Sequence, residues 1–141
     1  MKSKYDLDHR TPLRLVRQHL AEARAEGRIY VIANIVRVLH YRGHPEINLS
    51  DRERATLFKA LQSVRAGHKV LAHWLPLGYQ LARLMSLARR LSGRQIRLTR
   101  RDEKRIRHAA RWYRNNDDWH NRRQLRSLVL TAKDIGLDIT Q

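Results

Sequence analysis

The sequence predicts an all-α protein that forms a single compact domain of five to seven short helices over residues 1–141. Glycine and proline interrupt the chain at intervals of helix length, and Ser, Thr or Asp stands before several amphipathic segments. Apolar residues within those segments recur three and four positions apart, the period of a helix with one buried face. With 42% hydrophobic and 30% charged residues, the chain has the composition of a folded domain with a real core.

The first two helices are expected before residue 43. Thr11-Pro12 is a typical helix start, and Gly27 would end that helix. The segment Arg28–Arg42 is apolar on nearly all sides, which predicts a central buried helix. Its β-branched residues leave a strand over Ile29–Ile32 as an alternative.

The next two helices are bounded by capping residues, glycine and proline. Ser50-Asp51-Arg52-Glu53 has the form of a capping box, and Gly67 would end the helix that it opens. Pro76 ends a helix or starts the next one, over Leu77–Leu91, which Gly93 would terminate.

Two further helices are expected in the last third of the chain. Thr99 would cap a helix that extends to Asn115, with Asp102 at its third position. Residues 115–118 predict a turn and a new cap, and Gly136 would end the last helix. The apolar face of that last helix would be Leu125, Leu128, Val129 and Ala132.

A weak internal repeat connects two of these regions. Residues 47–53 align without a gap with residues 96–102, and the match extends to Arg65 and Arg114. The shared unit is a helix, a glycine stop, a short Ile-x-Leu loop and a capped helix. The alignment suggests two related helical hairpins, although unrelated hairpins could produce the same pattern.

The charge of the chain is strongly positive. It has 30 Lys+Arg against 13 Asp+Glu, a net charge of +17 and a pI near 11.5. Such an excess is typical of proteins that bind nucleic acid. Residues 83–126 hold 15 of the basic residues and only four acids, so we expect the binding surface in this C-terminal half.

The clearest charge pattern lies between Thr99 and Asn115. Basic residues there step by three and four, which places them on two adjacent stripes of a helix, the longer stripe being about 21 Å long. Trp112 lies beside them and, like Trp119, could stack on a base. The predicted nucleic-acid-binding residues are Arg100, Arg101, Lys104, Arg105, Arg107, Arg111, Trp112, Arg114, Arg122 and Arg123. Ile106, Ala109, Ala110 and Tyr113 remain to face a core.

The pattern Arg114-Asn115, followed by His120, resembles the Arg-Asn…His signature of the HEPN ribonucleases. This resemblance covers seven residues and implies a compact helical bundle in which Arg114 and His120 cleave RNA without a metal. Residues 116–118 predict a turn here, whereas the family usually has apolar or small residues on a helix. A third alternative is a basic interaction module or inhibitor that binds an acidic protein surface.

Other classes of site find little support in the sequence. The chain has no cysteine, and Gly43 and Pro45 break the segment that would align His40 and His44 as metal ligands. Phosphate-loop, dinucleotide-binding and Gly-x-Ser-x-Gly patterns are absent. We therefore expect no catalytic residue, metal or cofactor.

The sequence also bears on location and partners. No apolar run is long enough for a membrane span, and the first residues do not resemble a secretory signal, which predicts a cytoplasmic protein with no membrane partner. The expected function is non-enzymatic binding of DNA or RNA on the phosphate backbone. The chain would act as a regulator or as an accessory subunit with other proteins of a nucleoprotein complex.

Overall fold

In the computed structural model, which describes residues 7–140, the chain forms six helices and no strand over those residues. The all-α prediction is therefore confirmed, and Ile29–Ile32 is helical. The helices are α1 (Leu13–Glu26), α2 (Ile29–Tyr41), α3 (Asp51–Arg65), α4 (Leu77–Ser92), α5 (Arg100–Asn115) and α6 (Trp119–Asp134).

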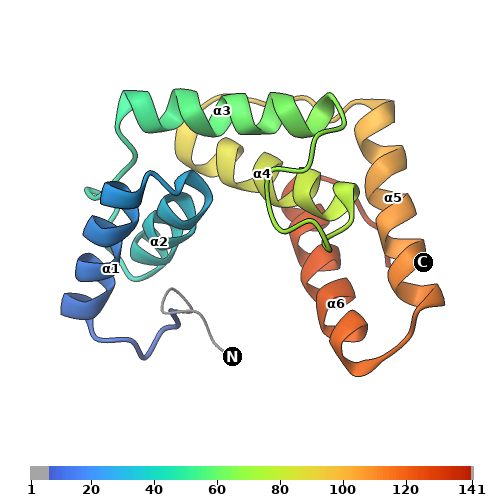
Figure 1. The fold of residues 1–141 in the computed structure, drawn as a ribbon, viewed down its shortest axis with the longest axis horizontal. Coiled ribbons are helices and arrows are strands. Elements are labelled where there is room, and N and C mark those ends of the chain that lie inside the picture. Colours follow the sequence, from blue (N-terminus) through green and yellow to red (C-terminus); the bar gives the residue numbers. More distant parts are fainter. Residues whose placement is uncertain (1–6, 141) are drawn as a thin grey trace.

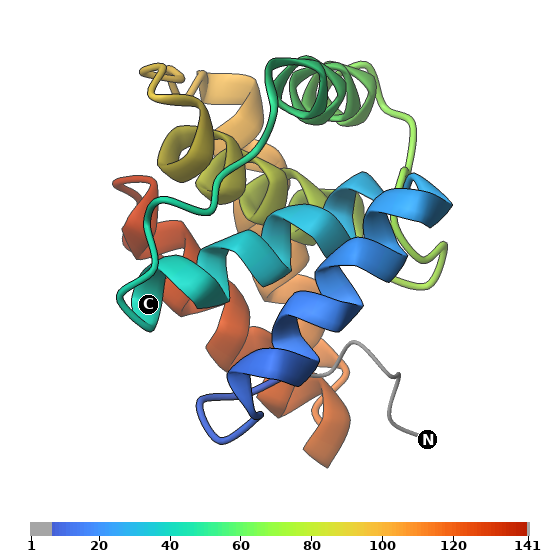
Figure 2. The same cartoon turned by 90° about the vertical axis from the view of Figure 1, so that its left-hand side faces the viewer.

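The helices are arranged as three consecutive antiparallel pairs that form an arch. α1 packs on α2, α3 on α4, and α5 on α6. Figure 1 shows α1 and α2 at one end of the arch, α3 and α4 across its top, and α5 and α6 at the other end. The even-numbered helices lie on the inner side, where α4 packs against both α2 and α6. Figure 2, a view from the side of the first pair, shows α1 lying alongside α2.

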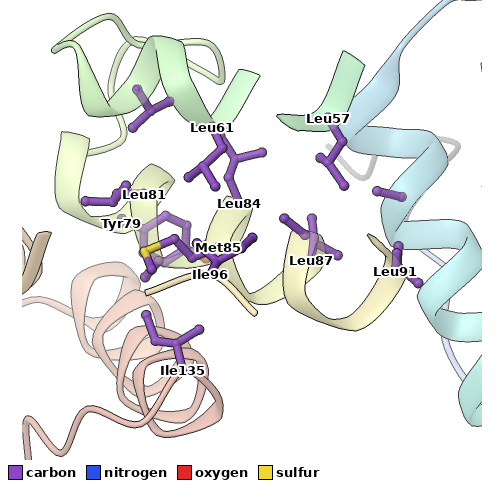
Figure 3. Packing of buried hydrophobic residues seen from close by; sticks show 14 of the residues in the cluster. Leu57, Leu61, Tyr79, Leu81, Leu84, Met85, Leu87, Leu91, Ile96 and Ile135 are labelled. Atoms are coloured by element: carbon purple, nitrogen blue, oxygen red, sulfur yellow. The ribbon is translucent and has the colours of Figure 1, made fainter. Parts of the chain in front are cut away.

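The core is built around α4. Figure 3 shows the leucines of α4 between side chains of α3, such as Leu57 and Leu61, and Ile135, which follows α6. Eleven residues of α4 are buried, against five in α2. The helix predicted over residues 28–42 is thus confirmed as α2, but its predicted central place is wrong. The reason is that α4 packs against α2, α3, α5 and α6, whereas α2 has one side on the inner face of the arch.

The helix ends follow the local signals closely. The predicted capping box forms between Ser50 and Glu53, and the predicted cap Thr99 also forms a capping box, with Asp102. Asp118 caps α6 by accepting a 2.8 Å hydrogen bond from the Asn121 amide. Pro12 is the residue before α1 rather than its first residue, a shift of one position.

The loop of the predicted repeat unit occurs a third time in the chain. After α6 the chain has Leu137-Asp138-Ile139-Thr140, the pattern of Ile47–Ser50 and Ile96–Thr99. Each of the three loops follows an even-numbered helix and has buried aliphatic side chains. Each also receives an arginine from the odd-numbered helix of the same pair.

These arginines are Arg24, Arg65 and Arg114, and each donates to a main-chain carbonyl of the loop. Arg24 binds the Asn48 carbonyl at 2.9 Å, Arg65 binds the Arg97 carbonyl at 2.8 Å, and Arg114 binds the Ile139 carbonyl. Three of the chain's arginines therefore help to hold the arch together. We refer to them as the clamp arginines.

The longest helices among the described residues have 16 residues, and none is long and apolar enough to cross a bilayer.

Candidate nucleic-acid interface

The inner face of α5 is the one that the sequence predicts. Ile106, Ala109, Ala110 and Tyr113 are buried against the core. Asp102 is buried with them, because it completes the α5 capping box and accepts a 2.9 Å hydrogen bond from Arg65. None of the basic side chains of α5 is among the buried residues of the helix.

Four of these cations have no partner among residues 7–140. Arg100, Arg101, Lys104 and Arg111 are exposed, and none has a side-chain hydrogen bond or ion pair with any of residues 7–140. From the first to the last they extend over about 16 Å of helix. They form the largest uncompensated part of the predicted interface.

Two arginines of the predicted interface have structural partners instead. Arg105 donates to the carbonyls of Val64 and Arg65, at 3.2 and 2.8 Å, and so binds the C-terminus of α3. A cation at this position satisfies the last carbonyls of a helix and complements its dipole. Arg114 is a clamp arginine and is half-buried. The guanidinium groups of both residues are therefore engaged in the fold.

The remaining predicted residues make exposed contacts. Arg107 pairs with Glu103 at 3.1 Å, and Arg122 pairs with Asp117 at 2.8 Å. Exposed ion pairs of this kind contribute only about 0–1 kcal/mol, so a phosphate could replace either carboxylate at small cost. The Arg123 guanidinium lies over the Trp119 ring, 5.6 Å from its centroid.

A groove runs along α5 where it meets the start of α4. It has a volume of about 520 Å³, with an apolar floor and a basic rim. We call it the α5 groove. Its floor is Pro76, Leu77, Gly78 and Ala109, and its rim is Arg101, Lys104, Arg105, His108 and Arg111.

The floor of the groove depends on a close approach of two backbones. A Cβ atom placed on Gly78 would lie 2.0 Å from the Arg105 carbonyl oxygen, so only glycine fits there. α4 begins at this point after Pro76, with no side-chain cap and no acidic residue in its first turn. Its positive end therefore adds to the field of the basic rim.

All three tryptophans are exposed, although tryptophan is usually well buried in folded proteins. Trp74 is 56% exposed, Trp112 43% and Trp119 71%. Trp112 lies on α5 itself, with its ring edge against Tyr113. Trp74 lies just before α4, and its ring is 5.7 Å from that of His120 at the start of α6. Flat rings are thus accessible on the segments around the α5 groove.

The segment that carries Trp74 is held by one buried side chain, Gln80. Its amide oxygen accepts from the Val70 and Leu71 amides, and its amide nitrogen donates to the Ala72 and Leu75 carbonyls, all at 2.8–3.1 Å. Gln80 is not among the functional residues that the sequence predicts. A polar amide on the otherwise apolar face of Leu77–Leu91 is the signal that could have identified it.

Arg114 and His120 lie on different helices. α5 ends at Asn115 and α6 begins at Trp119, with a turn between them. The Arg114 guanidinium binds the Ile139 carbonyl, while the His120 ring lies against Trp74. No hydrogen bond or ring contact joins the two residues in the described part of the chain.

The histidines and carboxylates of residues 7–140 do not converge in any group of three or more that could hold a metal ion. His40 is bound to the fold, with its Nε2 atom 2.9 Å from the Ile47 carbonyl oxygen.

Comparison with protein-family models, with curated proteins and with solved structures gave no match to this chain.

Proposed function

We propose that the protein binds nucleic acid, with phosphates along the α5 groove and unpaired bases stacked on the exposed tryptophans. The observation that carries this proposal is the set of four exposed α5 cations that have no partner in the described part of the chain, Arg100, Arg101, Lys104 and Arg111. The protein would act as a regulator or as an accessory subunit of a nucleoprotein complex.

The charge pattern of α5 favours a polyanion as the ligand. Like charges three and four residues apart on a helix destabilise it by about 0.2–0.5 kcal/mol per pair. The α4 dipole points its positive end toward the same groove, which adds to the repulsion. A chain of phosphates would relieve both the repulsion among the α5 cations and the repulsion from the α4 dipole. A single carboxylate would relieve only part of this repulsion.

The dimensions of the cation row also fit a nucleic-acid strand. About 16 Å corresponds to roughly five nucleotides at an axial rise of about 3.4 Å per nucleotide. The apolar floor of the α5 groove gives room for a sugar or the edge of a base.

The tryptophans favour single-stranded over double-stranded nucleic acid. A ring can stack on a base only where that base is unpaired or can leave its stack. Such stacking contributes about 1–3 kcal/mol per base and tolerates any sequence. We therefore expect tight binding to single strands with little base preference.

The test is a titration of the full-length protein with labelled twelve-nucleotide single strands of DNA and RNA, and with a duplex, at several salt concentrations. Four phosphate contacts predict a slope of log affinity against log salt of about −3 for single strands. The triple variant Arg101→Ala, Lys104→Ala, Arg111→Ala should bind at least tenfold more weakly, with a slope near −1. Tryptophan fluorescence should be quenched on binding to the unmodified protein.

The matched control is a triple variant that removes three exposed arginines of α1 and α3, Arg14→Ala, Arg17→Ala and Arg52→Ala. It loses the same net charge, and Arg52 occupies the position in α3 that aligns with Arg101 in α5. If both triple variants lose the same affinity and slope, the α5 groove is not the contact.

Two outcomes would favour the alternative functions. Polyglutamate that competes as well as an oligonucleotide of equal charge would indicate an acidic protein partner. Cleavage of RNA in EDTA that disappears in a His120→Ala variant would indicate a metal-independent ribonuclease.

A further inference from the structure

A second cationic cavity lies on the inner side of the arch, between α2, α4 and α6. It has a volume of about 520 Å³. We call it the inner pocket, and the residues that matter for its chemistry are Arg37, Tyr41, Arg83, Arg90, Ser127 and Lys133. Two smaller cavities adjoin it, and Arg37 lines all three.

One of the three arginines is neutralised within the fold. The Arg90 Nε atom donates to Asp134 Oδ2 at 2.9 Å, and its Nη2 atom donates to the other carboxylate oxygen. Its guanidinium also lies 5.2 Å from the centre of the Tyr41 ring. Asp134 is the only acidic residue that lines the inner pocket among residues 7–140.

Neither of the other two arginines has an acidic partner among residues 7–140. Arg83 donates to the Tyr30 hydroxyl at 3.2 Å. Arg37 makes no hydrogen bond or ion pair with any of residues 7–140, and its Nε atom is buried. Burial and, secondarily, the nearby Arg83 charge lower the pKa of Arg37 from its ordinary value. The acceptor oxygen of Asn34, which lines the cavity beside Arg37, is also buried without a partner.

This arrangement is costly in the absence of a ligand. An unpaired charge in a partly dry site destabilises the fold, and an arginine cannot relieve the strain by losing its proton. Two guanidinium groups that repel each other add to that cost. An anion bound between them would reverse both effects.

We propose that the inner pocket binds a phosphate group. Among the described residues that line it, the four cations Arg37, Arg83, Arg90 and Lys133 face the single carboxylate of Asp134, and this excess of positive charge suits a multiply charged phosphate better than a carboxylate. Tyr41 of α2 and Ser127 of α6 also line the pocket, and their hydroxyl groups can donate hydrogen bonds to a phosphate. A cavity of about 520 Å³ is far larger than one phosphate and has room for the rest of a nucleotide-sized molecule.

The phosphate could belong to a free small molecule or to a nucleic-acid strand. The inner pocket lies between α2, α4 and α6, and it shares no residue with the α5 groove. The inference therefore does not depend on the function proposed for α5, and the two can fail separately.

The experiment measures the melting temperature (Tm) of the full-length protein in a buffer without phosphate or sulfate. The added probes are inorganic pyrophosphate, adenosine 5′-monophosphate, succinate and sodium chloride at matched ionic strength. Pyrophosphate at 100 times its Kd should raise Tm by roughly 5–10 °C. Succinate and sodium chloride should give less than a third of that shift.

The variant is Arg37→Met, which keeps the length of the side chain but removes its charge. Without ligand its Tm should equal or exceed that of the unmodified protein, because a buried unpaired charge is lost. Its shift with pyrophosphate should disappear. The control Arg17→Met removes an exposed arginine of α1 and should keep the full shift. This combination separates a ligand site from a structural role, since a structural arginine would lower Tm in both conditions.

The probes also distinguish the sources of the phosphate. A shift with adenosine 5′-monophosphate indicates a free small molecule. Affinity for a single-stranded oligonucleotide that falls in Arg37→Met, without any shift by the small probes, indicates a strand phosphate. The proposal is overturned if Arg37→Met responds to every probe and to the oligonucleotide as the unmodified protein does. It is also overturned if succinate or sodium chloride matches the pyrophosphate shift.

Discussion

Substitution of Gly78 by alanine tests how the α5 groove is built. Gly78 lies in the first turn of α4, where the added Cβ would approach the Arg105 carbonyl oxygen to 2.0 Å and the Ala109 Cβ to 3.0 Å. Real Cβ atoms do not approach other atoms closer than 3.0 Å, so α5 must retreat from α4 by about 1 Å. The blocking atom belongs to the main chain and cannot rotate away.

The change in unfolding free energy follows from two opposing contributions, overpacking and helix propensity. Overpacking of this kind typically costs 1–3 kcal/mol, and rigid backbone on one side places this site at the upper end. Alanine gains up to about 1 kcal/mol over glycine in a helix. We expect a net loss of about 2 kcal/mol of unfolding free energy, or a fall in Tm of roughly 6–10 °C.

The assay is urea and thermal unfolding followed by circular dichroism, together with oligonucleotide affinity below the transition. Gly136→Ala is the comparison, because its Cβ would meet no atom within 4 Å and its cost arises only from a positive φ of 86°. That backbone cost is about 1–2 kcal/mol, but Gly136 does not line the groove, so oligonucleotide affinity should be unchanged. A Gly78→Ala variant with Tm within 1 °C of the unmodified protein and unchanged affinity would refute the backbone contact between α4 and α5.

Two further predictions concern the buried polar groups. Gln80→Glu should lower the unfolding free energy by about 2–4 kcal/mol at neutral pH, because a carboxylate cannot donate to the Ala72 and Leu75 carbonyls. Limited proteolysis should then cut residues 66–76 faster, and an unchanged cleavage rate would contradict the role of Gln80. The Arg90 guanidinium lowers the pKa of Asp134 below its ordinary value of 3.8, so this carboxylate stabilises the fold fully above that pH and progressively less below it. The difference in stability between the unmodified protein and Asp134→Asn should therefore shrink as the pH falls below 3.8, and urea titrations that show a constant difference from pH 7 to pH 3 would contradict it.

Helix positions could be predicted because their signals are local. A capping box such as Ser50 to Glu53 needs only four consecutive residues, and the inward face of α5 follows from its own period. The third Ile-x-Leu-type loop, Leu137–Thr140, is also visible in the sequence once aliphatic exchange is allowed. No distant contact is needed to recognise any of these features.

The roles of individual arginines could not be predicted in the same way. Arg101 and Arg105 lie one turn apart on the same predicted stripe, yet Arg101 is free and Arg105 binds the end of α3. The difference depends on the carbonyls of Val64 and Arg65, which are some forty residues away along the chain. Arg114 is likewise occupied by a loop that the sequence gives no reason to place beside it.

The inner pocket could not be predicted from the sequence for a related reason. Arg37 lies within the apolar segment 28–42, which predicts a buried helix, and Arg83 lies on the amphipathic segment that follows Pro76. Only the packing of α2 and α6 on either side of α4 brings Arg37, Arg83 and Arg90 into one cavity.

The sequence by itself determined the helices, their caps, the two faces of α5 and the large positive charge, because each depends on neighbours within about one or two turns. Tertiary structure alone decided which helix is central and which cations are used within the fold. It also decided which cations remain free for a ligand. A guanidinium group is satisfied or left unpaired by the carbonyls and carboxylates that packing brings to it, and those come from distant parts of the chain.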